Sequence, residues 1–88
     1  AIATQTSVTS SASTVVLLAA NANREGYTIF NDSTQILYVS MAATATTSSY
    51  AVKLFPNSCL SSELNYTGVI SGIWAAANGA AKLVEYSG

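Results

Sequence analysis

The sequence predicts an all-β protein: a small antiparallel β-sandwich or barrel of about six to seven short strands, with an extended N-terminal arm. Short runs of valine, isoleucine, tyrosine and phenylalanine recur along the chain, and these residue types favour strands. Turn-forming residues separate the runs roughly every 8–12 residues, which is typical of sandwiches and barrels. The competing helical segment 74–82 is rich in alanine, but Asn78-Gly79 in its middle argues against a helix.

The N-terminal residues 1–14 are small, rich in hydroxyl groups and uncharged. They lack the apolar periodicity of a helix or a core strand. Two interpretations remain open for this segment: a disordered tail, or an arm that adds as a strand to the sheet edge of a neighbouring subunit. In the second interpretation, Ile2 and Val8 are the apolar residues that contact the neighbour. Residues 15–88 are predicted to form a single β domain.

The first predicted strands lie between residues 14 and 41. Residues 14–18 form a β-branched run, and residues 26–31 are rich in strand formers. The segment 31–34 (Asn-Asp-Ser-Thr) has the composition of a turn, so residues 35–41 are predicted to return as the second strand of a hairpin. Apolar groups on both faces of 35–41 indicate a strand that is covered on both sides.

Further strands are predicted in the second half of the chain, at residues 50–55, 59–64, 69–75 and 80–86. Pro56 ends the first of these, because proline has no N–H to donate to a sheet. The strand at 59–64 is the weakest and is expected at a sheet edge. Asn78-Gly79 is the strongest hairpin signal in the chain, and it predicts that the last two strands pair with each other.

The low charge of the chain predicts a subunit of an assembly. Three basic and four acidic residues make up 8% of the 88 residues, whereas soluble domains average about 25%. Because surface charges keep small domains apart in solution, we expect a homo-oligomer. The basic residues are scattered, and Arg24 with Glu25 is interpreted as a solvated turn pair, so no nucleic-acid partner is expected. No apolar run approaches the roughly 18 residues of a membrane span, so no membrane partner is expected either.

Nothing in the sequence predicts a catalytic, cofactor-binding or metal site. The chain has no histidine, which is the commonest general base and metal ligand. The acids Glu25, Asp32, Glu63 and Glu85 are scattered, so an enzyme would need the fold to gather them in one cleft. Cys59 has no cationic neighbours that would activate a thiol, and it is interpreted as a small buried residue. We therefore expect a protein that is not an enzyme and that has no cofactor.

The aromatic residues offer three interpretations: interface anchors, core residues or a sugar-binding platform. Tyr38, Tyr66 and Trp74 are candidate anchors of a protein interface, because aromatic residues dominate the binding energy of interfaces. Ordinary core packing is the other interpretation of each residue. A sugar-binding platform would instead require two or three rings to lie coplanar on one exposed face.

Two segments carry a resemblance to a known family. NREGYTIFNDSTQILYVSM (23–41) has an arginine before the first strand, an Asn-Asp-Ser turn and a Leu-Tyr-Val return strand. NYTGVISGIWAAANGAAKLVEY (65–86) has a Tyr-Thr-Gly turn, a tryptophan strand and a last alternating strand. In this pattern the chain resembles small structural proteins of tailed bacteriophages. The matching positions are Arg24, Asn31, Asp32, Ser33, Leu37, Tyr38, Val39, Tyr66, Thr67, Gly68, Trp74 and Gly79.

The resemblance implies a β-rich virion protein that binds other virion subunits and is not an enzyme. Phage proteins of this size are best known as capsid decoration, or cement, proteins, which sit where capsomers meet, often as trimers. The expected partners are therefore the major capsid protein or other virion subunits, and further copies of the chain, with a trimer favoured. The expected location is the virion, with the capsid surface favoured over the tail. The alternative is a tail-associated receptor- or carbohydrate-binding β module.

Overall fold

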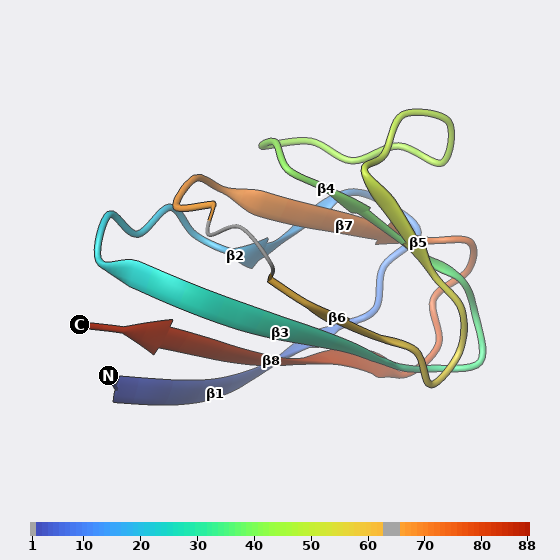
Figure 1. The fold of residues 1–88 in the computed structure, drawn as a ribbon. Helices are drawn as coiled ribbons and strands as arrows, with labels where there is room; N and C mark the ends of the chain where they lie inside the picture. Colours follow the sequence, from blue (N-terminus) through green and yellow to red (C-terminus); the bar gives the residue numbers. More distant parts are fainter. Residues whose placement is uncertain (1, 63–65) are drawn as a thin grey trace.

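The computed structural model describes residues 2–62 and 66–88, which form two antiparallel sheets of four strands each. Sheet A contains, in spatial order, β1 (Ile2–Thr9), β8 (Ala80–Ser87), β3 (Arg24–Asp32) and β6 (Cys59–Ser61). Sheet B contains β2 (Val15–Leu18), β7 (Ile70–Trp74), β4 (Leu37–Ser40) and β5 (Val52–Leu54). The predicted all-β sandwich is confirmed, with sheet A below sheet B in Figure 1. The described residues include no helix, and so none that could cross a membrane.

The N-terminal segment forms strand β1 and completes its own sheet. β1 pairs with β8 of the same chain along its full length, from Ile2 opposite Ser87 to Thr9 opposite Ala80. The two ends of the chain therefore lie side by side, as Figure 1 shows. No described residue pairs with the other edge of β1. The segment expected as an arm is thus extended and paired within its own chain, and its outer edge is open.

Neither predicted hairpin forms. β3 and β4 lie in different sheets, as do β7 and β8, so the segments 33–36 and 75–79 connect one sheet to the other. The hairpin predictions are wrong because turn composition indicates a reversal of the chain without saying whether the second strand pairs with the first. Among the described strands, β4 and β5 are the consecutive strands that do pair, across the segment 41–51.

The buried side chain of Asn31 explains why the chain changes sheets after β3. Its Nδ2 donates to the carbonyl oxygens of Gln35 at 2.8 Å and Leu54 at 2.9 Å. Its Oδ1 accepts from Trp74 Nε1 at 3.1 Å and from Ser33 Oγ at 2.7 Å. Because Leu54 and Trp74 belong to sheet B, these bonds attach the end of β3 to the facing sheet.

The two inter-sheet connections lie against each other at this end of the sandwich. Thr34 donates from its N and Oγ1 to Asn78 Oδ1, at 3.2 and 2.9 Å. Gly79 has a φ of 77°, and a Cβ atom there would overlap the carbonyl oxygen of Asp32 and approach Ser33. Only glycine fits both the left-handed backbone and this close approach. Asn78-Gly79 therefore packs the connection between β7 and β8 against the connection between β3 and β4, and it does not close a hairpin.

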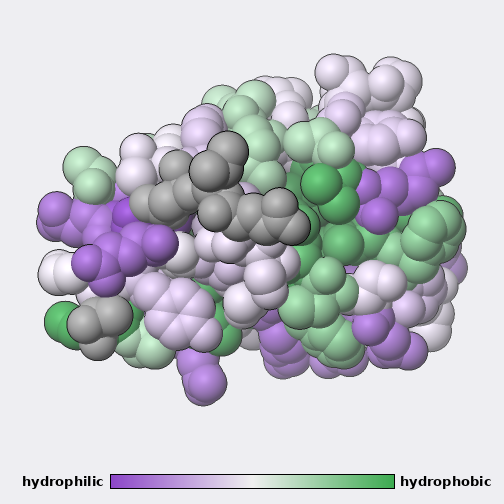
Figure 2. Space-filling model, viewed as in Figure 1, coloured by the Kyte–Doolittle hydropathy of each residue, from purple (hydrophilic) through white to green (hydrophobic). Residues whose placement is uncertain are grey.

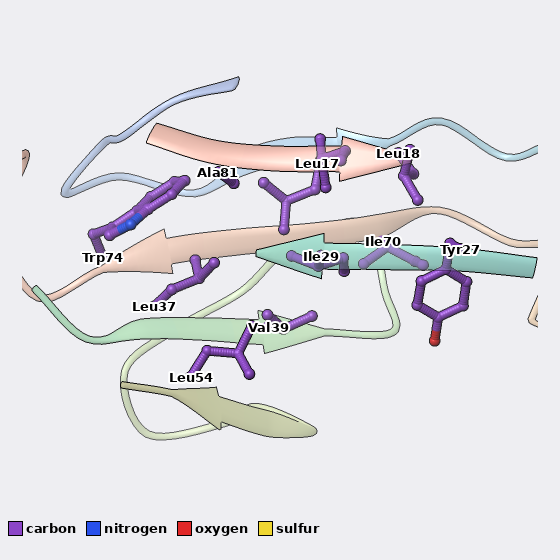
Figure 3. Close-up of a cluster of buried hydrophobic side chains, with 11 residues drawn as sticks. Leu17, Leu18, Tyr27, Ile29, Leu37, Val39, Leu54, Ile70, Trp74 and Ala81 are labelled. Atoms are coloured by element: carbon purple, nitrogen blue, oxygen red, sulfur yellow. The ribbon is translucent and has the colours of Figure 1, made fainter. Parts of the chain in front are cut away.

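Alternation along the strands fills the space between the sheets with apolar side chains. Figure 3 shows this core, with Trp74 at one end and Tyr27 at the other. Burial of each large aliphatic side chain contributes about 1.5–3 kcal/mol to the stability of such a small domain. The core members are Leu17, Leu18, Tyr27, Ile29, Leu37, Val39, Leu54, Ile70, Trp74, Ala81 and Leu83.

Strand β6 lies at the edge of sheet A, as predicted for this region, and it is short. Cys59 is exposed, so its interpretation as a buried residue is wrong. The reason is the two-residue period of a strand: Leu60 packs against the core, which turns its neighbours Cys59 and Ser61 outward. Residues 63 and 64 of the predicted strand lie outside the described residues.

Candidate functional site

The outer face of sheet A is a broad surface with few charges. The strand register places its side chains in rows across the sheet, such as Gln5–Val84–Thr28–Ser61. Lys82 is the basic residue on this face. Asp32 is the acidic one, at the end of β3. The outward positions, read from the register and the alternation of burial, are Ala3, Gln5, Ser7, Thr9, Gly26, Thr28, Phe30, Asp32, Cys59, Ser61, Ala80, Lys82, Val84 and Tyr86.

The two residues predicted for contact by the N-terminal segment are placed differently. Ile2 begins β1 and is 64% exposed. Val8 is half-buried and packs against the core from the same strand. Between them, Thr4 and Thr6 are exposed on the side that faces sheet B. The first two-thirds of β1 therefore extends beyond the cover of sheet B and is open on both faces.

The outer face of sheet B carries an aromatic pair beside a lysine. The rings of Tyr38 and Tyr50 lie with centroids 4.9 Å apart at an interplanar angle of 59°. Lys53 Nζ lies 5.7 Å from the centroid of each ring, which is within the range of cation–π attraction. Tyr50 is 39% exposed. Because the rings are tilted, they do not form the coplanar platform on which a sugar stacks.

An apolar surface also lies where the edges of the two sheets face each other at β5 and β6. In the view of Figure 2, hydrophobic atoms gather in the right half of the molecule, over this region. Phe55 follows β5 and is 56% exposed. Val52 and Leu60 are half-buried and pack against the core from the two edge strands. This surface is apolar, as a protein-contact surface would be. It is a second candidate contact surface beside the weakly charged outer face of sheet A.

Of the predicted aromatic anchors, Trp74 is buried and Tyr66 is half-buried. Trp74 is 1% exposed, so its interpretation as an anchor is corrected to core packing. Its indole is held by the bond to Asn31 in the corner of the sandwich. Tyr66 is half-buried against the core, and its hydroxyl donates to the carbonyl oxygen of Met41 at 3.1 Å. Of the three aromatic candidates, Tyr38 is the one on an outer face.

A charged cluster that the sequence did not predict is centred on Arg24, which is 2% exposed. Its Nε donates to Glu85 Oε2 at 2.8 Å. Its Nη1 donates to the carbonyl oxygens of Tyr66 at 2.7 Å and Gly68 at 2.9 Å, and its Nη2 donates to that of Ala19. A buried guanidinium is tolerated only when its donors are bonded in this way. The cluster therefore fixes two connecting segments against β3 and β8.

The interpretation of Arg24 and Glu25 as a solvated pair is wrong. Glu25 is exposed, whereas Arg24 faces inward and pairs with an acid 61 residues away in the sequence. A signal for this pairing was present, because strand alternation puts Glu85 on the same face as buried Leu83. An acid on a core face requires a buried partner. Nearby, burial raises the pKa of the Tyr27 phenol, and the positive charge of Arg24 partly offsets that rise.

The acids do not gather in a cleft within the described residues. Across residues 2–62 and 66–88 the structure has no cavity, and no three His, Cys, Asp or Glu side chains are grouped for a metal ion. Glu85 lies opposite Tyr27 and Asp32 lies opposite Ala80, so the backbone positions of the two acids are roughly 17 Å apart along the strands. Glu63 lies outside the described residues.

The described surfaces offer flat faces and strand edges, which suit contact with another protein. Among the predicted site residues, Ile2 is exposed and Tyr38 is half-buried on the outer face of sheet B, so the two belong to different sheets. Comparisons of the chain with protein-family models, with curated proteins and with solved structures found no match.

Proposed function

We propose that this protein is a non-enzymatic structural subunit that works by binding other protein subunits. The observation that carries the proposal is the outer face of sheet A, which spans four strands and carries one basic and one acidic side chain, Lys82 and Asp32, at the paired outward positions of the described residues. Flat, weakly charged surfaces bind through apolar burial and hydrogen bonds. An isolated domain of this size normally covers such a face with charge.

The proposed assembly is the head of a tailed bacteriophage, with the chain as a capsid decoration, or cement, protein. This placement is supported by the sequence resemblance in residues 23–41 and 65–86. A cement protein binds the assembled lattice and not its free subunits, so it shifts the equilibrium towards the intact shell. Weak contacts repeated over a symmetric lattice add up through multivalency.

Co-sedimentation with capsid shells of the encoding phage tests the proposal. We expect the purified protein to sediment with assembled shells and not with free major capsid protein, and to raise the temperature at which the shells break open. Absence of binding to shells would overturn the cement proposal.

Val84→Lys places a charge in the centre of the outer face of sheet A, so we expect it to weaken binding. Thr44→Lys adds the same charge on the exposed segment between β4 and β5 and should bind like the natural chain.

A second candidate is a tail-associated receptor- or carbohydrate-binding module. The observation that favours it is the exposed ring of Tyr50 beside Tyr38, because sugars stack on aromatic rings. It ranks second because the two rings are tilted by 59°. Binding of the isolated domain to a glycan array, abolished by Tyr50→Ala, would support this candidate against the cement proposal.

A further inference from the structure

The outer edge of β1 differs from the other sheet edges of the molecule. β5 and β6 have three residues each, and Pro56 follows β5 closely. β2 has four residues and a break in register between Val16 and Leu18. β1 has eight residues, no charge, no proline and no break in its pairing with β8. Proteins protect long edges with charges, prolines or bulges because an open edge pairs with other strands. β1 has none of these protections.

The pairing with β8 fixes which backbone groups of β1 are open. Ser10 N donates to Gly79 O at 3.0 Å, in the same register that runs through β1. In an antiparallel pair the residues that face the partner alternate, so the even-numbered residues bond to β8. The N–H and C=O groups of Ala3, Gln5, Ser7 and Thr9 therefore point to the open edge.

We propose that this edge pairs with the β1 edge of a second copy of the chain, antiparallel, to make one continuous eight-stranded sheet. The register that uses all four open residues pairs Ala3 with Thr9 of the second copy and Gln5 with Ser7 of the second copy. With two bonds for each pair, this register forms about eight hydrogen bonds across the two-fold axis. The inference rests on the edge itself and is independent of the virion placement.

The second copy is the occupant that fits this edge best. In the proposed register Thr6 lies opposite Thr6 of the second copy, and Thr4 lies opposite Val8, so no like charges meet. Cross-strand pairs of threonine and β-branched residues favour a sheet. Pairing of β1 with the β6 edge of another copy would use only a three-residue strand. That arrangement would also leave free ends and form open chains, whereas the β1–β1 contact closes at two copies.

A pair of proline substitutions tests the edge. Gln5→Pro removes an N–H that points to the open edge, so it leaves the bonds between β1 and β8 in place. By the two-fold symmetry it removes two bonds of the dimer, and we expect the dissociation constant to rise at least about tenfold. Thr4→Pro removes an N–H that bonds to β8, so it should lower the thermal midpoint of the monomer instead. Light-scattering mass over a concentration series, with thermal melts, measures both effects.

A cross-link tests the register. In a Cys59→Ser background, Thr6→Cys places two sulfurs across the symmetry axis, where Cα atoms of such a pair lie about 4.5 Å apart, within disulfide reach. Ile2→Cys is the control, because the two copies of residue 2 would lie about 27 Å apart. We expect mild oxidation to give a covalent dimer for Thr6→Cys and none for Ile2→Cys.

Three outcomes would overturn the edge pairing. They are a monomer at every concentration, equal cross-linking of the two cysteine variants, and a trimer whose mass Gln5→Pro leaves unchanged. The last would support the stoichiometry expected from the phage resemblance. None of them bears on shell binding, so failure of the edge pairing and failure of the cement proposal are told apart.

Discussion

The two ends of strand β3 each bury one polar side chain, but they satisfy it in different ways. Arg24 at the start of β3 is charged and donates to the Glu85 carboxylate and to carbonyl oxygens of two connecting segments. Asn31 near the other end is neutral and both donates and accepts. Among the described residues, no buried side-chain nitrogen or oxygen lacks a partner.

The two ends differ in the kind of group that is left unpaired when the central side chain, Arg24 or Asn31, is removed. Loss of Arg24 leaves the partly buried carboxylate of Glu85 without its counter-ion. Loss of Asn31 leaves neutral groups, which are backbone carbonyl oxygens and the indole N–H of Trp74, without this hydrogen-bond partner. An unpaired charge is more costly to bury than an unpaired neutral group. The charged end should therefore be the more sensitive end of the molecule.

Arg24→Met tests the charged end and should have the largest effect. We expect the free energy of unfolding to fall by about 3–5 kcal/mol, as for the loss of one partner from a buried ion pair. Urea denaturation measures the change. The control is Glu25→Gln at the exposed neighbouring position, which should change stability by no more than about 0.5 kcal/mol. A cost below about 1 kcal/mol for Arg24→Met would show that the cluster is not a major support of the fold.

Asn31→Ala tests the neutral end. It removes the partner of Trp74 Nε1 and of two carbonyl oxygens, and we expect a loss of about 2–4 kcal/mol in the same urea experiment. Asn23→Ala, at an exposed asparagine, is the matched control and should be nearly neutral. If Asn31→Ala proves more costly than Arg24→Met, the ranking of the two ends is reversed.

Gly79→Ala tests the close contact of the two connections near Asn31. The substitution adds a Cβ against the carbonyl oxygen of Asp32 and forces alanine to a φ of 77°. We expect a loss of about 1–3 kcal/mol. Gly26→Ala is the comparison, because its φ is not positive and its Cβ would lie 3.3 Å from the Ser62 side-chain Oγ, so it should cost less. Equal thermal midpoints for the two variants would argue against strain at the corner.

Tyr27 should give the smallest effect, seen as a dependence on pH near the charged end. Burial raises the pKa of its phenol in the folded protein, against a partial opposing effect of Arg24. The contribution of this phenol to stability is therefore present below its unfolded pKa of about 10 and is lost as the pH rises through the folded value. Unfolding in urea between about pH 8 and pH 11 should show this fall, and Tyr27→Phe should reduce it. An identical fall in Tyr27→Phe would assign it to other groups.

The sequence was sufficient for strands β2 to β8, but it did not predict β1 as a strand of its own sheet, and it was insufficient for the strand pairing. Runs such as 14–18 and 35–41 contain the observed β2 and β4, because β-branched and aromatic residues fit a half-buried strand surface. The connections after β3 and after β7 were interpreted as hairpins because turn chemistry is local. The choice of sheet depends instead on Asn31 bonding to Leu54 and Trp74, which are 23 and 43 residues away.

The candidate surface could likewise be predicted from the sequence only in part. The low charge was visible in the composition, and the structure places two of the seven charged residues, Lys82 and Asp32, on the outer face of sheet A. Which aromatic residues remain on the surface was not visible. Tyr38 and Trp74 both lie in strongly apolar strands, and only the register separates an outward ring from a buried one.

The position of β8 in sheet A has a consequence for synthesis on the ribosome. β8 lies between β1 and β3 and pairs with both, yet it is the last of the eight strands to be translated. At about 5–20 residues per second, β1 therefore waits several seconds for the strand that anchors it. Sheet A cannot close until β8 has emerged, so its completion follows the synthesis of the other seven strands. During that interval both edges of β1 are open, and nascent chains on neighbouring ribosomes could meet there.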